Sequence, residues 1–261
     1  MTDKLFSVDG QVVLAAGASR GIGRALAEGF AQRGAQVVIA GREADTLEKT
    51  AKEISSGGKS VKAIVCDVSK PEDVNRLVEE TLSTFGRIDT LLNIAGVNKR
   101  MKVEDYPPDV YDWIIDINLR GSFMLAQAVG RHMISRKSGC IVNVDSLNTY
   151  APLTGVAPYA MSKAGVLMMT RAMAHEWGRH GIRVNSIAPG FFPTALSEKL
   201  WAEKGMRDWA ETHTPLGKLG DVKELVGTAI FLASPAAAFI TGQTVRVDGG
   251  ITAGITWPIP L

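Results

Sequence analysis

The amino-acid sequence predicts an α/β fold with a mostly parallel sheet of about seven strands. Apolar runs of about five residues alternate with amphipathic segments along the chain, and only short breaks separate them. No repeat or interdomain linker divides the 261 residues. Strands that alternate with amphipathic helices are typical of right-handed βαβ crossovers. Residues 1–261 are therefore expected to form one Rossmann-type, doubly wound domain with helices on both faces of the sheet.

Seven apolar runs are expected to form the strands, because their length and β-branched content suit segments buried on both faces. They are Val12–Ala16, Val37–Ala40, Val61–Cys66, Ile88–Asn93, Cys140–Val144, Val184–Ile187 and Thr244–Val247. Parallel sheets bind ligands at the carboxyl ends of their strands. The residues that follow each run are therefore the first candidates for a site.

The segments between the runs show the 3.6-residue period of helices. The residues that share one face are Ile22, Ala25, Leu26 and Phe30 in the first helix and Val74, Leu77, Val78 and Phe85 in the third. Pro71 is expected at a helix start, with Ser69 as its N-cap. The weakly patterned stretch Pro189–Pro215 predicts a substrate lid around residues 190–215. A surface excursion with short helices of its own is the alternative.

The composition is that of an ordinary soluble globular protein, with 46% hydrophobic and 21% charged residues. No basic block indicates a nucleic-acid or membrane partner, and no apolar run of membrane-spanning length occurs. Cys66 and Cys140 lie far apart and are expected to be buried thiols of a cytoplasmic protein without a signal peptide. No metal site is expected, because His175 and His180 are five residues apart and diverge on a helix.

A glycine-rich turn joins the first strand to the first helix. It contains Gly17, Ser19, Arg20, Gly21, Ile22 and Gly23. Glycines let the backbone turn sharply, and free N–H groups at a helix start attract a pyrophosphate. The turn therefore predicts a dinucleotide cofactor.

The end of the second strand indicates which dinucleotide is bound. An NAD site places an acid there for the ribose 2′-hydroxyl, whereas this chain has Arg42, with Arg20 on the neighbouring turn. Two guanidiniums can hold a 2′-phosphate through forked hydrogen bonds. NADP(H) is therefore expected to be preferred. NAD(H) stays possible because Glu43 follows Arg42 directly.

A candidate proton-transfer pair lies after the fifth strand. Tyr159 and Lys163 are four residues apart, which places them on one helical face. A phenol has a pKa of about 10, and a neighbouring ammonium is expected to lower it toward neutral pH. Ser146, at the end of the fifth strand, can donate a hydrogen bond to an oxygen that gains charge. Beside a bound nicotinamide, this set predicts an alcohol/carbonyl oxidoreductase.

The GxxxGxG turn, the strand-terminal serine and the YxxxK pair together resemble the short-chain dehydrogenase/reductase family, over nearly the whole chain. The resemblance implies hydride transfer between NADP(H) and a secondary alcohol or ketone. It implies a water-holding catalytic role for Asn118 beside Ser146, Tyr159 and Lys163. Its implied cofactor contacts, besides the glycine-rich turn and Arg42, are Asp67, Val68, Asn93, Ala95, Gly96, Tyr159, Lys163, Pro189, Gly190 and Thr194.

The chain departs from the family at three places. Ala16 replaces a threonine before the turn, and Ile94 replaces an asparagine in the element after the fourth strand. Asp145 stands where a serine or threonine is usual. Alternation along the strand is expected to aim the Asp145 side chain away from Ser146.

Within the family the chain most resembles gluconate 5-dehydrogenase-type sugar-acid reductases, on residues 95–100, 130–133 and 156–159. Arg100 is expected to pair with a substrate carboxylate, while Ser146 and Tyr159 meet the reacting oxygen. A 3-oxoacyl-[acyl-carrier-protein] reductase is the alternative, and its basic rim would consist of Lys99, Arg100, Lys102 and Arg136. A non-catalytic NADP(H) sensor is the alternative of another class. Family resemblance also implies a homotetramer, built through the helices after Pro108 and Pro158.

Overall fold

The computed structural model describes residues 4–56, 58–194 and 197–255. Seven parallel strands form one sheet in the order β3-β2-β1-β4-β5-β6-β7. The strands are β1 Val12–Ala16, β2 Gln36–Gly41, β3 Val61–Val65, β4 Thr90–Asn93, β5 Gly139–Val144, β6 Ile182–Pro189 and β7 Thr244–Val247. The predicted Rossmann-type fold is confirmed. The strand order reverses between β1 and β4, which is where such sheets bind ligands.

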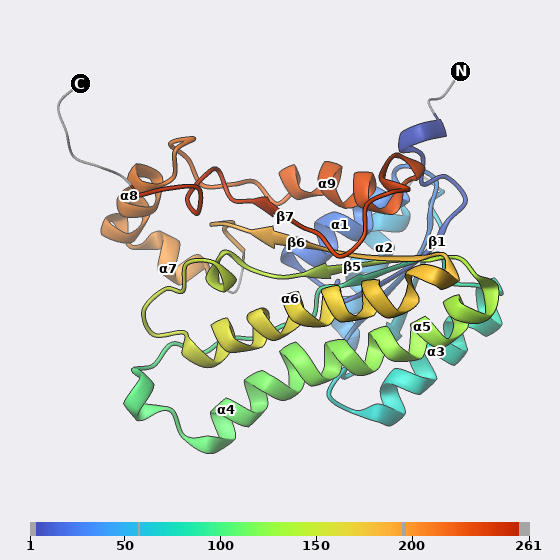
Figure 1. Cartoon of the computed structure of the whole chain (residues 1–261), viewed down its shortest axis with the longest axis horizontal. Helices are drawn as coiled ribbons and strands as arrows, with labels where there is room; N and C mark the ends of the chain where they lie inside the picture. The colour runs from blue at the N-terminus through green and yellow to red at the C-terminus, as the bar shows by residue number, and fades with distance from the viewer. Residues whose placement is uncertain (1–3, 57, 195–196, 256–261) are drawn as a thin grey trace.

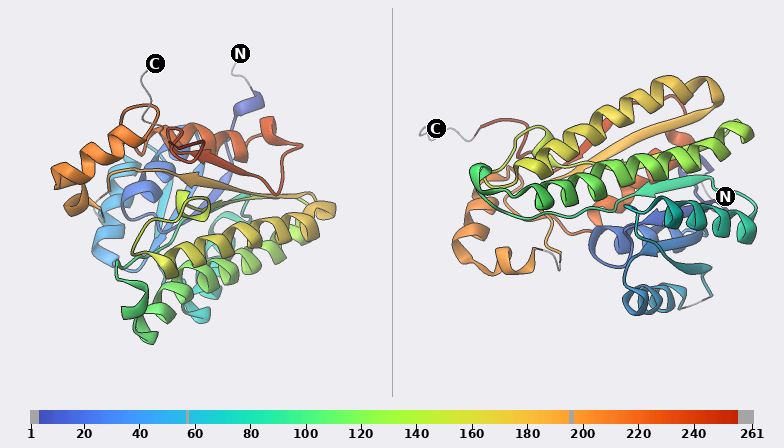
Figure 2. Two further views of the ribbon diagram at one scale, coloured as in Figure 1. Left: turned by 60° about the vertical axis from the view of Figure 1, so that its left-hand side comes forward. Right: turned by 90° about the horizontal axis from the view of Figure 1, so that it is seen from below.

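Helices cover both faces of the sheet (Figures 1 and 2). On one face lie α1 Gly21–Ala31, α2 Ala44–Ser55 and α9 Glu224–Ala233. On the other lie α3 Pro71–Phe85, α4 Pro108–Ile115, α5 Ser122–Arg136 and α6 Ala157–Trp177. The short helices α7 Glu198–Ala202 and α8 Lys204–His213 lie beyond the carboxyl end of β6.

Alternate residues of each strand belong to opposite core layers, as the period of two in a strand requires. Val13 and Ala15 of β1 pack with α1, α2 and α9, whereas Leu14 and Ala16 pack with α3, α5 and α6. The expectation of strands buried on both faces holds for β1 and β4 but is wrong for β3 and β7. These two strands form the edges of the sheet, where each lacks a neighbouring strand on one side.

The start of α3 differs from the expectation. Pro71 is its first residue, as predicted, but Lys70 occupies the N-cap position and no side chain caps the helix. Ser69 instead donates its hydroxyl to Asp67 Oδ1 at 2.7 Å. Asp67 Oδ1 also accepts the Ser69 N–H at 3.0 Å, so this local turn engages the serine before the helix begins.

The stretch predicted to be irregular contains the short helices α7 and α8, as the alternative reading described. Phe191 packs edge-on against Trp201 and Trp209, with ring centroids 5.4 and 6.0 Å apart. Residues 195 and 196 of this stretch lie outside the described residues. Within the part that is described, no helix is both long and apolar enough to cross a membrane. Cys66 and Cys140 are buried, free thiols, as expected.

Candidate active site

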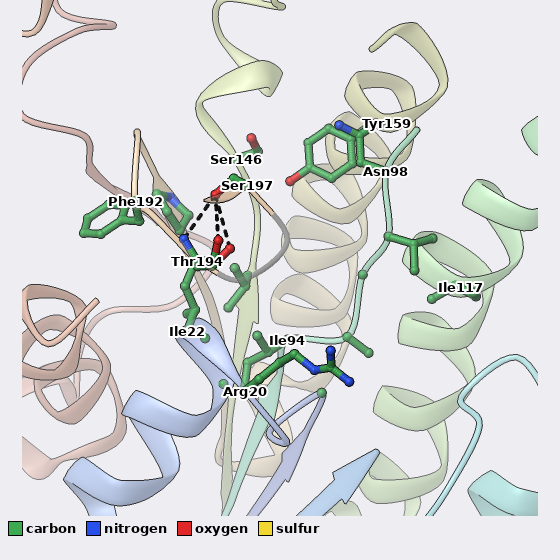
Figure 3. Close-up of a pocket in the computed structure, with 18 of the residues that line it drawn as sticks. Arg20, Ile22, Ile94, Asn98, Ile117, Ser146, Tyr159, Phe192, Thr194 and Ser197 are labelled. Carbon is green, nitrogen blue, oxygen red and sulfur yellow. Dashed lines mark hydrogen bonds between the residues drawn. The ribbon is translucent and has the colours of Figure 1, made fainter. Parts of the chain in front are cut away.

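The carboxyl ends of the central strands open into a cavity of about 610 Å³ (Figure 3). All predicted site residues except Asn93 and Asn118 line it. The glycine-rich turn, Arg42, Asp67 and Val68 are brought together there with Ser146, Tyr159 and Lys163. Residues that are more than 140 positions apart in the sequence therefore share one site.

The glycine-rich turn is held tightly against the loop after β4. Gly17 has a φ of 84°, in the left-handed region that favours glycine. A Cβ atom on Gly17 would lie 2.6 Å from Ala95 N, and one on Gly23 would lie 2.1 Å from Gly17 O. No side chain caps the start of α1. Its first N–H groups can therefore receive an anion, and the turn fits a dinucleotide pyrophosphate.

The two arginines expected to hold a 2′-phosphate have different surroundings. Arg20 forms an ion pair with Glu43, and both side chains line the cavity. Glu43 also accepts a hydrogen bond from Thr46 Oγ1 at 3.1 Å. The contacts with Thr46 and Arg20 lower the pKa of Glu43, which keeps it ionised. Arg42 lines the same cavity and lies exposed.

Asn93 lies inside the sheet and does not line the cavity. Its Nδ2 donates to Ser122 O at 2.9 Å and to Asn143 Oδ1 at 3.1 Å. These contacts tie β4 to α5 and to β5. The contact with cofactor that the family resemblance implied is not supported by this position.

Asn118 also lies behind the cavity wall. It belongs to a π-helical turn, Asp116–Gly121, between α4 and α5. Its Oδ1 accepts the Val97 N–H at 2.7 Å, and its Nδ2 donates to Val97 O at 2.9 Å and to Ser162 Oγ at 3.1 Å. Asn118 therefore fixes the backbone that follows β4. π-Turns of this kind are frequent at functional sites.

Gly96 separates Asn118 from Lys163. A Cβ atom on Gly96 would lie 3.4 Å from Asn118 Oδ1 and 3.5 Å from Lys163 Nζ. The small residue lets the loop after β4 pass between the π-turn and α6. A larger residue at position 96 would crowd Asn118 and Lys163, so the small size of Gly96 is needed for contacts within the protein as well as for the predicted approach of the cofactor.

Lys163 is buried and directed toward the end of β5. Its Nζ donates to Val144 O at 2.8 Å and lies 5.8 Å from the centroid of the Tyr159 ring. Burial lowers the pKa of Lys163 to about 8, and the Asp145 carboxylate opposes this change. The ammonium is therefore one helical turn from the phenol, as the spacing predicts, without a hydrogen bond to it.

The Tyr159 hydroxyl points toward the side of the cavity where Ser146 lies (Figure 3). Tyr159 stays partly accessible through the cavity, yet the surrounding protein raises its pKa by burial. Asp145 raises it further, whereas the Ser146 hydroxyl lowers it. The expectation that Lys163 lowers the pKa of the phenol is wrong in this structure. Burial dominates, because it disfavours the charged phenolate.

Ser146 is positioned by a residue that the sequence reading missed. Asn148 donates to Ser146 Oγ from both its backbone N and its Nδ2, each at 3.1 Å. Asn148 Oδ1 in turn accepts the Leu153 N–H at 2.9 Å. Because Ser146 Oγ accepts these two hydrogen bonds, the Ser146 hydroxyl proton is directed away from Asn148 and can be donated to another group. A serine followed two residues later by asparagine, just past a strand, is the local signal that was available.

Asp145 is one of the residues that line the cavity, and it is 1% exposed. The backbone stays extended past Val144, because the Asp145 N–H donates to Ile187 O at 2.8 Å and Ser146 has a φ of −163°. The side chains of Asp145 and Ser146 are therefore expected to point to opposite sides. Asp145 Oδ1 accepts the Thr149 hydroxyl at 2.5 Å, while Oδ2 is buried without a hydrogen-bond partner. Burial raises the pKa of this carboxyl to about 6.

The outer wall of the cavity contains residues that no motif indicated. They are Asn98, Leu147, Asn148, Leu153, Phe191, Phe192, Ser197, Leu200 and Trp201. Arg100 lines the cavity at its exposed rim, as predicted, next to exposed Lys99. Arg136 does not: it binds Ile88 O and Asp89, before the start of β4 and at the opposite end of the sheet.

Known proteins match nearly the whole chain. A family model of the short-chain alcohol dehydrogenase type, described as enoyl-(acyl carrier protein) reductase, matches residues 17–252. Gluconate 5-dehydrogenase of Gluconobacter oxydans is 41% identical over 251 residues, which are 96% of this chain and 98% of that protein. A 3-oxoacyl-[acyl-carrier-protein] reductase of Synechocystis is 40% identical over 249 residues, 92% of this chain and 96% of that one.

Solved structures match equally well. The crystal structure of a gluconate 5-dehydrogenase from Burkholderia cenocepacia in complex with NADP and tartrate is 39% identical to this chain. Its TM-score is 0.93, and the match covers 97% of this chain and 99% of that one.

Proposed function

We propose a specific reaction for this chain, which belongs to the short-chain dehydrogenase/reductase family and is an oxidoreductase that acts on CH–OH groups. The reaction is the interconversion of a secondary alcohol and a ketone with NADP(H). The substrate is a sugar acid, such as the gluconate/5-ketogluconate pair. One observation carries the proposal: Ser146, Tyr159 and Lys163 line the same cavity as the glycine-rich turn.

The proton transfer is assigned to Tyr159. When bound, the nicotinamide ring supplies or accepts the hydride. The raised pKa of Tyr159 keeps its phenol protonated, so it can give a proton to a carbonyl oxygen during reduction. Ser146 already accepts two hydrogen bonds from Asn148, which leaves its own proton for the same substrate oxygen. In the oxidising direction the phenolate form of Tyr159 accepts the proton of the alcohol.

NADP(H) is the proposed cofactor, with NAD(H) as the weaker ligand. Arg20 and Arg42 both line the cavity, next to the turn that receives the pyrophosphate. Two guanidiniums favour a 2′-phosphate over a hydroxyl. The relative of known structure from Burkholderia cenocepacia, crystallised with NADP, supports this choice.

A sugar acid fits the remaining part of the cavity. Arg100 offers a guanidinium at the rim for a substrate carboxylate, and Asn98 and Asn148 offer amides for hydroxyls. Relatives named gluconate 5-dehydrogenase and 5-keto-D-gluconate 5-reductase support this substrate class. Residues 190–215, with Phe191 and Trp201 on the cavity wall, are proposed to close over it as a lid.

A 3-oxoacyl-[acyl-carrier-protein] reductase is the second candidate. Lys99, Arg100 and Lys102 form an exposed basic group in the loop after β4, which suits an acidic carrier protein. The relative from Synechocystis carries that name. A non-catalytic NADP(H) sensor is the third candidate. It is disfavoured because a sensor does not need Ser146, Tyr159 and Lys163 together.

NADPH consumption by the purified chain separates these candidates. The substrates are 5-ketogluconate, neutral ketoses and an acetoacetyl thioester, each assayed alone. We expect the highest kcat/KM with 5-ketogluconate, and replacing Arg100 by alanine should raise KM for this acid far more than for a neutral ketose. A preference for the thioester identifies the carrier-protein reductase. Tight NADPH binding without any turnover identifies the sensor.

The role of Tyr159 is tested by Tyr159→Phe. The substitution removes only the hydroxyl, so we expect NADPH to bind with a nearly unchanged Kd. The rate should fall by at least the ~10²–10⁴-fold that a positioned acid contributes. Stopped-flow turnover and fluorescence titration measure the two effects. Appreciable residual activity would show that another group transfers the proton.

The chain is proposed to form a homotetramer and to act in the cytoplasm. A homotetramer is supported by large apolar side chains exposed on the outer surfaces of α4, α5 and α6, namely Tyr111, Trp113, Phe123, Met161 and Met168. A cytoplasmic location is supported by the two free, buried thiols, Cys66 and Cys140. Metal ions have no part in the proposed reaction.

A further inference from the structure

Asp145 has no role in the proton transfer described above, although it is one of the residues that line the same cavity. Asp145 is 1% exposed. Its Oδ1 accepts the Thr149 hydroxyl at 2.5 Å, and the Ser146 N–H also bonds the carboxyl. Its Oδ2 is buried and has no hydrogen-bond partner. A buried carboxylate with a free oxygen is costly, so its retention calls for a source of positive charge.

The groups around Asp145 supply only part of that charge. Within the described residues, the titratable groups that interact with it are Lys163 and Tyr159, both on α6. Strand β6 contributes the Ile187 carbonyl, which accepts the Asp145 N–H at 2.8 Å. Lys163 donates to Val144 O, and no ion pair joins it to Asp145 in this part of the chain. The carboxylate is therefore near a cation without direct contact.

Asp145 is adjacent to the proposed reaction centre, where the nicotinamide ring has to lie to exchange a hydride with the substrate. It precedes Ser146, and Pro189 and Gly190 at the end of β6 line the same cavity. The nicotinamide ring carries a positive charge in the oxidised cofactor and none in the reduced cofactor. A fixed negative charge at this position therefore interacts with one redox form and not with the other.

Resting on the proposed cofactor site, we propose that Asp145 sets the relative affinity of the enzyme for NADP⁺ and NADPH. Its ionised carboxylate favours the positively charged ring of NADP⁺. The neutral, protonated carboxyl has no such preference. Asp145 thus acts through the cofactor's charge and takes no part in the proton transfer to substrate.

The proposal makes cofactor discrimination depend on pH. Burial raises the pKa of Asp145 to about 6, so the carboxyl is ionised above this pH and neutral below it. The preference for NADP⁺ should therefore weaken as the pH falls through about 6. The 2′-phosphate also titrates near pH 6. Both forms of the cofactor carry that phosphate, so its titration cancels in the ratio of their dissociation constants.

The test measures Kd for NADP⁺ and for NADPH by titration without substrate, from about pH 5 to about pH 8, a range that spans the titration of a carboxyl near pH 6. In the unmodified enzyme, the ratio Kd(NADP⁺)/Kd(NADPH) should rise about tenfold toward low pH, the order expected for a unit charge in a site of intermediate dielectric constant. Asp145→Asn should make this ratio high and independent of pH. Glu79→Gln, which removes an exposed carboxylate on α3, is the matched control and should leave the pH dependence unchanged.

A second variant keeps the carboxylate and moves its titration. Thr149→Val removes the hydroxyl that lowers the pKa of Asp145, so the change in the ratio should shift to higher pH. Calorimetry in buffers of different ionisation enthalpy gives an independent readout. Near pH 6, NADP⁺ should release more protons on binding than NADPH does, and Asp145→Asn should remove the difference.

The outcomes separate this inference from the proposed function. If neither cofactor binds, the proposed dinucleotide site is wrong. If both bind but the ratio is independent of pH in the unmodified enzyme, or keeps its pH dependence in Asp145→Asn, the inference about Asp145 is overturned and the proposed function stands.

Discussion

Glu43 determines how freely Arg20 can meet a 2′-phosphate. Glu43 forms an ion pair with Arg20, and both residues line the cavity. A bound 2′-phosphate therefore has to compete with the Glu43 carboxylate for the Arg20 guanidinium. We expect Glu43→Gln to bind NADPH more tightly by about fivefold at most, since an exposed ion pair contributes little free energy. Fluorescence titration with NADPH measures this.

NADH is the control ligand for that variant. It lacks the 2′-phosphate, so its Kd should stay the same or rise when the carboxylate is removed. Equal gains for NADH and NADPH would mean that Glu43 acts on the whole cofactor rather than on its 2′-phosphate.

The buried carboxylate of Asp145 should reduce stability at neutral pH. Its pKa is raised by burial to about 6 in the folded protein, above the usual 3.8, so the folded state binds the extra proton. The penalty is fully present above pH 6 and disappears as the pH falls below the unfolded pKa. Asp145→Asn should therefore raise the unfolding free energy by up to about 3 kcal/mol at neutral pH.

Urea unfolding at neutral pH and near pH 4 measures this effect. Near pH 4 the carboxyl is protonated in the folded protein, and the gain from Asp145→Asn should be small. A gain of the same size at both pH values would point to a packing effect without a charge term.

The sequence predicted the residues whose spacing alone defines a function. Tyr159 and Lys163 are adjacent because four residues make about one helical turn, and Ser146 follows a strand that the apolar pattern marks. The contact of Asn148 with Ser146 was missed, because it depends on the short turn after β5. The pKa of Tyr159 could not be predicted from a neighbouring lysine, since burial outweighs it.

Among the elements, the strands were the most predictable. All seven expected runs contain strands, because apolar β-branched segments between turns have few alternatives. The ends were less certain: β4 begins at Thr90, and Ile88 before it is buried outside the strand. Which strands lie at the edges depends on strand order, and no local pattern contains that information.

The π-turn that carries Asn118 was not predicted, because its sequence continues the helical pattern of α4 into α5. We expect Asn118→Leu to leave the Val97 N–H and C=O without partners and to cost about 1–3 kcal/mol of stability for each such group that stays unsatisfied. The loop at Gly96 and Val97 lines the cavity, so NADPH affinity and kcat should both fall. Chemical unfolding, NADPH titration and turnover measure the three effects.

Ser162→Ala is the matched control for Asn118. It removes the Ser162 hydroxyl that accepts from Asn118 and keeps both bonds to Val97. A much smaller loss is expected. If both variants lose the same activity, the bonds to Val97 are not what Asn118 contributes.

At the scale of the whole molecule, the sheet with its two helical layers follows from the sequence, and the outer wall of the cavity does not. Leu147, Phe191 and Ala210 form a small core cluster of their own, apart from the two main layers. This cluster joins α8 to the turn after β5. Residues 190–215 have a weak hydrophobic pattern, which does not show which faces of α7 and α8 are buried. The packing of these two helices could therefore not be predicted from the sequence.

The proposed tetramer predicts which surface is sensitive to charge. Met168 is 58% exposed on α6, a helix of the layer that also contains α4 and α5. Met168→Glu should lower the mass measured by light scattering, because a buried contact would have to accept a carboxylate. Met206→Glu, at an exposed position on α8, is the control and should keep the mass of the unmodified protein.

The contact between Gly17 and Ala95 has a consequence for how such a chain can evolve. The two loops come from distant parts of the sequence, and not even a methyl group fits between them. A change in the length of one loop is therefore expected to require a change in the other. The cofactor-binding half of the site, which these loops form, should vary little between related sequences. The helices α7 and α8 have no such constraint. Relatives that act on a different substrate are therefore expected to differ first in the sequences of α7 and α8 and to keep the cofactor-binding loops unchanged.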